Sequence, residues 1–326
     1  MKKFILQIGI FLLFAAAFYF VALNIWGVYA PKFMAGNVKQ KIGVHGFTAK
    51  RIHDVGEVSN VDILFIGSSH CYRGYDPRIF QRENFSSFNL GSNSQTPIQS
   101  EILLKRHLKN LSPDLVILDV YPVVMQNDGI ESTIDFLGNT TIQKDLAAIA
   151  LQSKNAVVLN TLLFRYTRQN LGLDTLPIHR TTKGSDTYVE YGFVQNNAVF
   201  KNTATYSTKK IEFSDDQVDA FENMIQFLND EKINYIIVQS PLARARYQSY
   251  SNNREMDSTF ASYGRYYNFN EMATVPDSLF IDDSHLNQNG VEFFNNKLIE
   301  RLKMDGILWD KEKTEATKSL SSLSTF

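Results

Sequence analysis

Short apolar runs bounded by Gly or Pro restrict the fold of this chain more than any other sequence feature. They read VDILFIG over 61–67, PDLVILDVYP over 113–122 and INYIIVQSP over 233–241. Runs without alternation are typical of strands that are buried on both faces, as in a parallel sheet. Helical spacing is found between and after them, over 97–109 and 291–302. This succession predicts an α/β fold, a three-layer parallel sheet covered by helices on both faces.

Weaker signals complete the outline. Shorter strands are expected over 86–91 and 266–270. Ser214 and Gln217 have the spacing of a capping box, which predicts the start of another helix. Residues 123–211 form a long insertion between strands, expected to be helical in its first part and irregular in its second.

The N-terminus is apolar for long enough to cross a membrane. Residues 4–26 contain no charged side chain, and at about 1.5 Å per residue they span the roughly 30 Å hydrocarbon core. A cleavable signal peptide would have a shorter apolar region, and a buried core helix is the other alternative. Lysines flank the segment on both sides, so the positive-inside rule leaves its orientation open.

These features predict four parts, with the insertion inside the third. They are a transmembrane anchor over 4–26, a juxtamembrane stalk over 27–60, an α/β domain over 61–310 and a disordered tail over 311–326.

Composition excludes several classes of function. The 326 residues include 33 Lys and Arg against 34 Asp and Glu, so no basic excess is available to hold nucleic acid. The single cysteine, Cys71, excludes an intramolecular disulfide and a cysteine-based zinc site. No Walker loop, G-x-G-x-x-G or H-E-x-x-H motif is present. We therefore expect no cofactor and no metal.

A serine follows the first apolar run directly, in GSSH over 67–70. Because parallel sheets bind ligands beyond the carboxyl ends of their strands, Ser69 is a candidate nucleophile at that edge. Gly-Ser-Ser after a strand is also ordinary turn chemistry, and this alternative stays open. Cys71 is a second candidate, but it would need an electropositive and partly exposed setting.

The segment FIDDSHLNQNG over 280–290 places Asp282 three residues before His285. In a turn, this spacing lets the carboxylate accept a hydrogen bond from the imidazole Nδ1, which leaves Nε2 free to take a proton from a serine. Asp283 is the competing carboxylate. An Asp that caps a helix beside an unrelated His is the alternative.

Four blocks, in order, resemble the SGNH (GDSL-like) hydrolase superfamily. They are ILFIGSSHCYRGYDP, FNLGSNSQT, PDLVILDVYP and FIDDSHLNQNG. The resemblance implies a flavodoxin-like SGNH fold and a triad of Ser69, His285 and Asp282. It also implies that the backbone N–H groups of Ser69 and Ser94 stabilise an oxyanion. The family's third donor, an asparagine, is absent; Tyr121 lies near its position, either as a replacement donor or as a packing residue.

The anchor, the GSSH sequence and the missing asparagine make this chain less similar to the soluble lipases of the superfamily than to a membrane-anchored subgroup. That subgroup includes the DltD-like teichoic-acid D-alanylation proteins and the alginate acetylation proteins. This likeness implies a cytoplasmic N-terminus and a body outside the cytoplasmic membrane. It also implies an acylated glycan or envelope polymer as substrate and a membrane acyltransferase as partner.

The sequence therefore predicts a membrane-anchored serine esterase or O-acyltransferase. A catalytically inactive binding or assembly protein with the same fold is the alternative, and a lipid esterase is a third possibility. Gln239 and Ser240, at the end of a strand, are predicted to contact the substrate. The insertion is predicted to fold over the catalytic edge and to bring Tyr188, Tyr191 or Phe193 near the cleft; packing at the far end of the sheet is the alternative.

Overall fold

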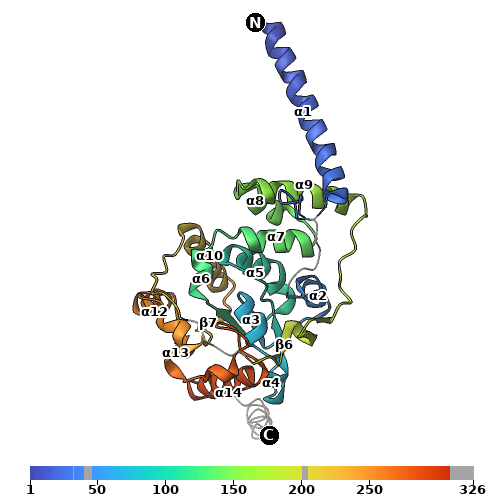
Figure 1. Cartoon of the computed structure of the whole chain (residues 1–326). Coiled ribbons are helices and arrows are strands. Elements are labelled where there is room, and N and C mark those ends of the chain that lie inside the picture. The colour runs from blue at the N-terminus through green and yellow to red at the C-terminus, as the bar shows by residue number, and fades with distance from the viewer. Residues whose placement is uncertain (32, 40–45, 200–204, 309–326) are drawn as a thin grey trace, which may run out of the picture.

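One long helix projects from a three-layer α/β body (Figure 1). The computed structural model describes residues 1–31, 33–39, 46–199 and 205–308, and the expected tail over 311–326 lies outside them. The strands are β1 (Ile63–Ile66), β2 (Ser87–Asn89), β3 (Leu115–Asp119), β4 (Thr182–Lys183), β5 (Asp186–Val189), β6 (Phe193–Asn196), β7 (Asn234–Gln239) and β8 (Tyr266–Asn268). The helices are α1 (Lys2–Tyr29), α2 (Thr48–Asp54), α3 (Ser69–Gly74), α4 (Pro77–Arg82), α5 (Pro97–Leu111), α6 (Pro122–Gln126), α7 (Ile130–Asn139), α8 (Lys144–Gln152), α9 (Ala156–Asn170), α10 (Asp215–Asp230), α11 (Arg244–Gln248), α12 (Asn253–Ser262), α13 (Phe269–Met272) and α14 (Gln288–Met304), with short 3-10 turns η1 (Val55–Glu57), η2 (Glu190–Gly192) and η3 (Asp277–Leu279).

The main sheet contains five parallel strands in the order β2-β1-β3-β7-β8. Ile63 of β1 pairs with Ser87 of β2 on one side and with Leu115 of β3 on the other. This is the 2-1-3-4-5 order of flavodoxin-like sheets, so the predicted fold class is confirmed. Because the strand order reverses beside β1, ligands of such a sheet bind beyond the carboxyl ends of β1 and β3.

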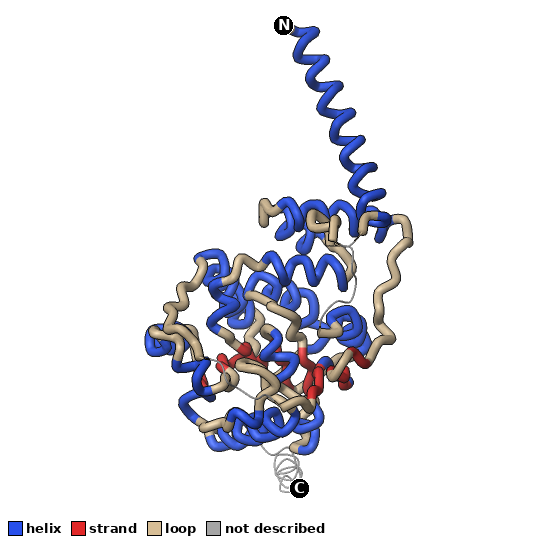
Figure 2. Tube along the Cα trace, in the orientation of Figure 1, coloured by secondary structure: helices blue, strands red, loops and turns tan. Residues whose placement is uncertain are grey.

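Alternate residues of the central strands point to opposite faces of the sheet. Leu64 of β1 packs in a core with residues of α5 and α10, whereas its neighbour Phe65 packs in a second core with residues of α4 and α14. Figure 2 shows helices on both sides of the strands. Since both faces are covered, every strand position can be apolar, which accounts for the unbroken runs in the sequence.

The helix expected after Ser214 forms as α10, but the predicted capping box is wrong. Ser214 makes no side-chain capping hydrogen bond. The Gln217 amide instead donates to the carbonyl of Asn127 at 3.0 Å and accepts from the N–H of Ile98 at 3.4 Å. Gln217 is fully buried and satisfies main-chain groups of two distant segments, a tertiary role that a local motif does not reveal.

The insertion is more regular than expected. Helices α6 to α9 occupy its first part, and β4, β5 and β6 form a small antiparallel sheet where the sequence predicted irregular chain. This sheet is joined to the body by Arg73 of α3, whose guanidinium donates to both carboxylate oxygens of Asp186 in β5 at 2.8 and 2.7 Å.

Part of the expected stalk belongs to the body. Arg51 of α2 is fully buried and donates to the carbonyls of Gly46 and Gly192 at 2.9 and 2.8 Å. Its guanidinium also lies 4.8 Å from the ring centroid of Tyr72. Within the described residues, only α1 is long and apolar enough to cross a membrane.

Candidate active site

Ser69 lies at the start of α3, immediately beyond the carboxyl end of β1. The preceding Ser68 is 1% exposed, and its Oγ accepts from the backbone N–H of His70 at 3.3 Å. Ser68 therefore faces inward as the cap of α3, whereas Ser69 is half-buried at the edge of the sheet.

Asp282 and His285 share a tight loop between η3 and α14. The N–H of Ile281 donates to the carbonyl of His285 at 2.8 Å, which closes the loop. The loop also packs closely on the start of α14. A Cβ at Gly290 would lie 2.1 Å from the carbonyl oxygen of Leu279, so this approach requires glycine.

Helix α14 holds this loop against α3. The Asn295 amide donates to the carbonyl of Gly74 at 2.6 Å, and its Oδ1 accepts from the N–H of Asp76 at 2.9 Å. Asn295 is fully buried, so both contacts are shielded from water. The two helices thereby bring His285 to Ser69 across 216 residues of sequence.

Ser69, His285 and Asp282 form one hydrogen-bonded row. The Ser69 Oγ lies 2.8 Å from His285 Nε2, and His285 Nδ1 lies 2.8 and 3.0 Å from the two oxygens of Asp282. Asp282 Oδ1 also accepts from the N–H groups of Ser284 and His285 at 2.9 and 2.8 Å. This geometry orients the imidazole to take a proton from Ser69.

The environment keeps Asp282 ionised. Partial burial raises the pKa of Asp282, but the hydrogen bonds and charge of His285 and the two backbone N–H groups outweigh that effect and hold the pKa well below its usual range. The competing carboxylate, Asp283, lies 3.6 Å from the guanidinium of Arg246 instead of contacting the imidazole.

His70 is a neighbour of the site to which the sequence assigned no role. Its ring stacks on Tyr121 with centroids 3.9 Å apart and lies 5.1 Å from the ring of His285. Burial and the nearby His285 lower the pKa of His70 well below its usual value, so its imidazole is neutral. Cys71 is also fully buried, and burial raises the pKa of its thiol, which argues against Cys71 as the nucleophile.

The loop that carries Ser94 is held against α3 by Asn89. The Asn89 amide donates to the carbonyls of Cys71 and Tyr75 at 2.8 and 3.1 Å, and its Oδ1 accepts from the N–H of Gly91 at 3.0 Å. Ser94 has φ +49°, in the left-handed region that glycine adopts most easily.

Two main-chain donors remain available beside this loop. Among the described residues, the backbone N–H groups of Ser69 and Ser94 donate to no protein acceptor. The Tyr121 hydroxyl, the candidate third donor, lies 3.4 Å from the hydroxyl of Tyr250, and the ring packs on His70.

Gln239 and Ser240 do not line an open cleft, contrary to the prediction from their position at a strand end. They are 2% and 4% exposed. Gln239 accepts from the hydroxyl of Tyr266 at 2.7 Å, and Ser240 hydrogen-bonds to Asp119 beneath the edge. Burial raises the pKa of Asp119 to about 7, against the opposing effect of its hydrogen bonds from Ser240 and Tyr75.

The prediction for the second part of the insertion is also wrong. Tyr191 lines a hollow together with Asp62 and Ser86, which precede β1 and β2, so it lies at the end of the sheet opposite to the candidate site. Tyr188 is buried and donates to Asp54 at 2.8 Å, and Phe193 is fully buried in the core. Tyr188 packs with Tyr72 of α3 and Phe193 packs with Phe65 of β1, so these two side chains join the small sheet to the body instead of facing a ligand.

Two other parts of the insertion do come close to the site. Glu131 of α7 accepts from Asn93 at 2.9 Å, next to Ser94. Tyr206 lies against Arg246, with the guanidinium 5.3 Å from the ring centroid, beside Asp283. The sequence offered no signal for Tyr206 or Arg246 as neighbours of the loop that carries Asp282 and His285, because neither residue lies in a motif.

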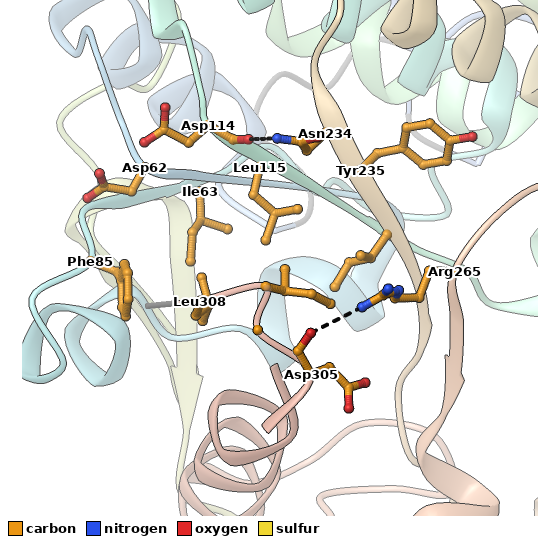
Figure 3. A pocket seen from close by; sticks show the side chains of 13 residues that line it. Asp62, Ile63, Phe85, Asp114, Leu115, Asn234, Tyr235, Arg265, Asp305 and Leu308 are labelled. Carbon is orange, nitrogen blue, oxygen red and sulfur yellow. Dashed lines mark hydrogen bonds between the residues drawn. The ribbon is translucent and has the colours of Figure 1, made fainter. Parts of the chain in front are cut away.

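A separate cavity of about 380 Å³ opens at the amino ends of β1, β3 and β7. Figure 3 shows Asp62, Asp114 and Asn234 among the residues that line it, and Arg265 with its hydrogen bond to the carbonyl of Asp305. It lies at the end opposite to Ser69 and contains no nucleophile paired with a base, so it is not the candidate active site. In the described part of the chain, no group of three or more His, Cys, Asp or Glu residues is placed to hold a metal ion.

The sequence matches no protein-family model and no curated protein. Similar solved structures include a GDSL-like lipase from Bacteroides thetaiotaomicron (13% identity, TM-score 0.37, 78% of this chain and 98% of that chain). They also include a protein classed as an acylhydrolase from Bacteroides fragilis (12%, 0.37, 76% and 93%) and one classed as a lipolytic protein of the G-D-S-L family from Desulfitobacterium hafniense (11%, 0.36, 72% and 96%). At these identities and TM-scores, the functional argument rests on the geometry of the site alone.

Proposed function

We propose that this protein is a membrane-anchored serine esterase or O-acyltransferase that acts on acyl esters of an envelope glycan or polymer. The observation that carries the proposal is the 2.8 Å contact between Ser69 Oγ and His285 Nε2, with Asp282 on the far side of the imidazole. A serine hydroxyl is a weak nucleophile until an oriented base takes its proton, and this row supplies such a base.

The reaction begins when Ser69 Oγ attacks the ester carbonyl and its proton passes to His285 Nε2. Asp282 accepts the hydrogen bond from Nδ1–H and stabilises the imidazolium. The backbone N–H groups of Ser69 and Ser94 donate to the oxyanion of the tetrahedral intermediate. As the intermediate collapses, the ester C–O bond breaks, His285 protonates the leaving alcohol, and the acyl group remains on Ser69.

The second half of the reaction reverses these roles. His285 takes a proton from an incoming hydroxyl, whose oxygen attacks the acyl carbonyl and releases Ser69. Water as the incoming group yields a carboxylic acid, and a sugar hydroxyl yields a new ester. Both outcomes use the same side chains, so the acceptor decides between hydrolysis and transfer.

The location and substrate class are part of the same proposal. Helix α1 is long and apolar enough for a single membrane crossing, and we place its N-terminus in the cytoplasm and the body outside as part of this proposal. A body held on the outer side of the cytoplasmic membrane has access to acylated envelope polymers and to a membrane acyltransferase that would supply acyl groups. The alternative, an inactive assembly protein, has less support because it gives no reason for the oriented row of Ser69, His285 and Asp282.

A serine-directed fluorophosphonate tests the proposal on the full-length protein in detergent. Wild type and Ser68→Ala are expected to be labelled, and Ser69→Ala is not. Ser68→Ala is a matched control, since it removes only a helix cap at a cost of about 1 kcal/mol. Labelling that survives Ser69→Ala would contradict Ser69 as the nucleophile. No labelling of wild type together with no turnover of an acyl-ester reporter would favour the inactive alternative.

A further inference from the structure

The end of α1 packs on α9 of the insertion, which lies across its base in Figure 1. The Tyr19 hydroxyl donates to Asn160 Oδ1 at 2.7 Å, and Leu23 packs in one buried cluster with Phe164. At Gly27, a Cβ would lie 2.4 Å from the Phe164 ring, so the two helices are in close contact. Helix α9 therefore touches α1 over more than two turns.

The length of α1 fixes the depth of this contact. Counted from Phe4, the roughly 20 residues needed to cross a 30 Å hydrocarbon core end near Leu23. If instead the whole contact from Tyr19 onward lay in water, residues 2–18 would provide only about 26 Å. That shift would also draw the charged Lys2 and Lys3 into hydrocarbon, which is costly. The side of α9 that contacts Leu23 therefore lies where the hydrocarbon core of the bilayer ends, on the side of the body.

An apolar stripe runs along α9 beside its contact with α1. Its members recur every three or four residues and therefore share one face of the helix: Ala156, Leu159, Leu163 and Tyr166. Leu163 and Tyr166 are 40% and 52% exposed. Asn160 and Phe164, which contact α1, follow Leu159 and Leu163 in the sequence. They therefore lie on the face of α9 next to the apolar stripe.

More exposed apolar side chains lie in the segments beside α9. They are Phe33 and Met34 after α1, Leu151 in α8, and Leu171 and Leu173 after α9. Two of the nearby charges are neutralised by pairing: Arg165 and Arg168 both pair with Asp174, at 2.6 and 2.7 Å. Contiguous exposed apolar surface of this kind marks an interaction site in a folded protein.

We propose that α8, α9 and the turn through Leu173 bind the lipid surface of the bilayer that α1 crosses. They lie in its membrane–water interface on the side of the body. Interfacial helices bury their apolar face about 5–10 Å into the boundary between headgroups and acyl chains. The rise from Tyr19 to Leu23 along α1 is about 6 Å, which matches this depth. The inference rests on the membrane anchoring in the proposed function and adds that the body is seated on the bilayer instead of tethered above it.

Environment-sensitive probes on the full-length protein in liposomes test this arrangement. The only native cysteine, Cys71, is fully buried, so an introduced cysteine takes the label. An NBD probe is placed by Leu163→Cys or Leu171→Cys on the proposed membrane surface and by Leu12→Cys within α1. Glu300→Cys is the matched control, because it is an exposed position on α14, at the end of the body away from α1 in Figure 1.

Lipids that carry a nitroxide on the acyl chain are expected to quench the probes at positions 12, 163 and 171, while aqueous iodide quenches the probe at position 300. Quenching at 12 together with iodide access at 163 and 171 would overturn the inference and leave the anchor intact. A probe at 12 that only iodide reaches would contradict the anchoring itself, and the inference with it. Labelling of Ser69 by the fluorophosphonate is independent of either result.

Discussion

Replacement of Asp282 by Asn tests the proposed role of the hydrogen-bonded row of Ser69, His285 and Asp282 with the least disturbance to the loop. Asp282 Oδ1 accepts from the backbone N–H groups of Ser284 and His285, and an amide oxygen in that place keeps both contacts. The second oxygen, 2.8 Å from His285 Nδ1, becomes an NH₂ group that donates. The imidazole then accepts at Nδ1 and carries its proton on Nε2, where it can no longer take the proton of Ser69.

The expected loss in kcat is about 10²–10⁴, or about 3–5 kcal/mol of transition-state stabilisation. The assay is turnover of an acyl-ester reporter by the full-length protein in detergent, with the melting temperature measured in parallel. Asp283→Asn is the matched control, since Asp283 faces Arg246 at 3.6 Å, and its kcat is expected to stay within about twofold of wild type. Equal losses in the two variants, or an Asp282→Asn enzyme with more than a tenth of wild-type kcat, would refute the assignment.

Three further predictions concern stability and the supports of the site. Burial raises the pKa of Asp119 to about 7, so the folded protein holds an extra proton between about pH 4 and 7 and loses up to about 1.4 kcal/mol of stability per pH unit as the pH rises. Asp119→Asn should flatten this fall in melting temperature from pH 5 to 7; an unchanged slope would contradict the shift. Gly290→Ala should lower both kcat and melting temperature, since its Cβ would meet the carbonyl oxygen of Leu279 at 2.1 Å, whereas Gly56→Ala, with nothing within 4 Å, should change neither. Arg73→Lys removes a bidentate pair with Asp186 and should make the small sheet more sensitive to protease than Arg82→Lys, which alters an exposed pair with Glu292; equal sensitivity would argue against that role.

The central sheet was predictable because its strands are covered on both faces. Runs such as 115–118 are apolar at every position, and in a chain with intervening helices that pattern is typical of buried parallel strands. The proximity of Ser69 to His285 was also predictable, since Ser69 follows the first strand and His285 precedes the last helix, and in a doubly wound sheet both positions can face the same edge. The chemical roles of these residues remain predictions for the labelling and kinetic experiments.

The predictions that were wrong concern residues whose positions depend on tertiary contacts. Gln239 and Ser240 end a strand at the predicted edge, but the side chains of Tyr266 and Asp119 hold them inside the protein. Tyr191 lies in a polar stretch whose strands pair only with each other and contact the body through α3 and β2, so the sequence carried no signal for where they pack. In the same way, the buried amide of Gln217 resembles a capping residue until its partners are known.

The two hydrogen bonds between Asn295 and the chain at the end of α3 have a consequence for synthesis of the protein. The ribosome makes Ser69 first, and His285, the proposed base, follows 216 residues later, with α14, the helix that positions it, directly after. Contacts this distant in sequence close late in folding. Under the proposed function, a nascent chain that crosses the membrane would therefore carry an inert hydroxyl among the polymers, and activity would begin only when the whole body has emerged and closed.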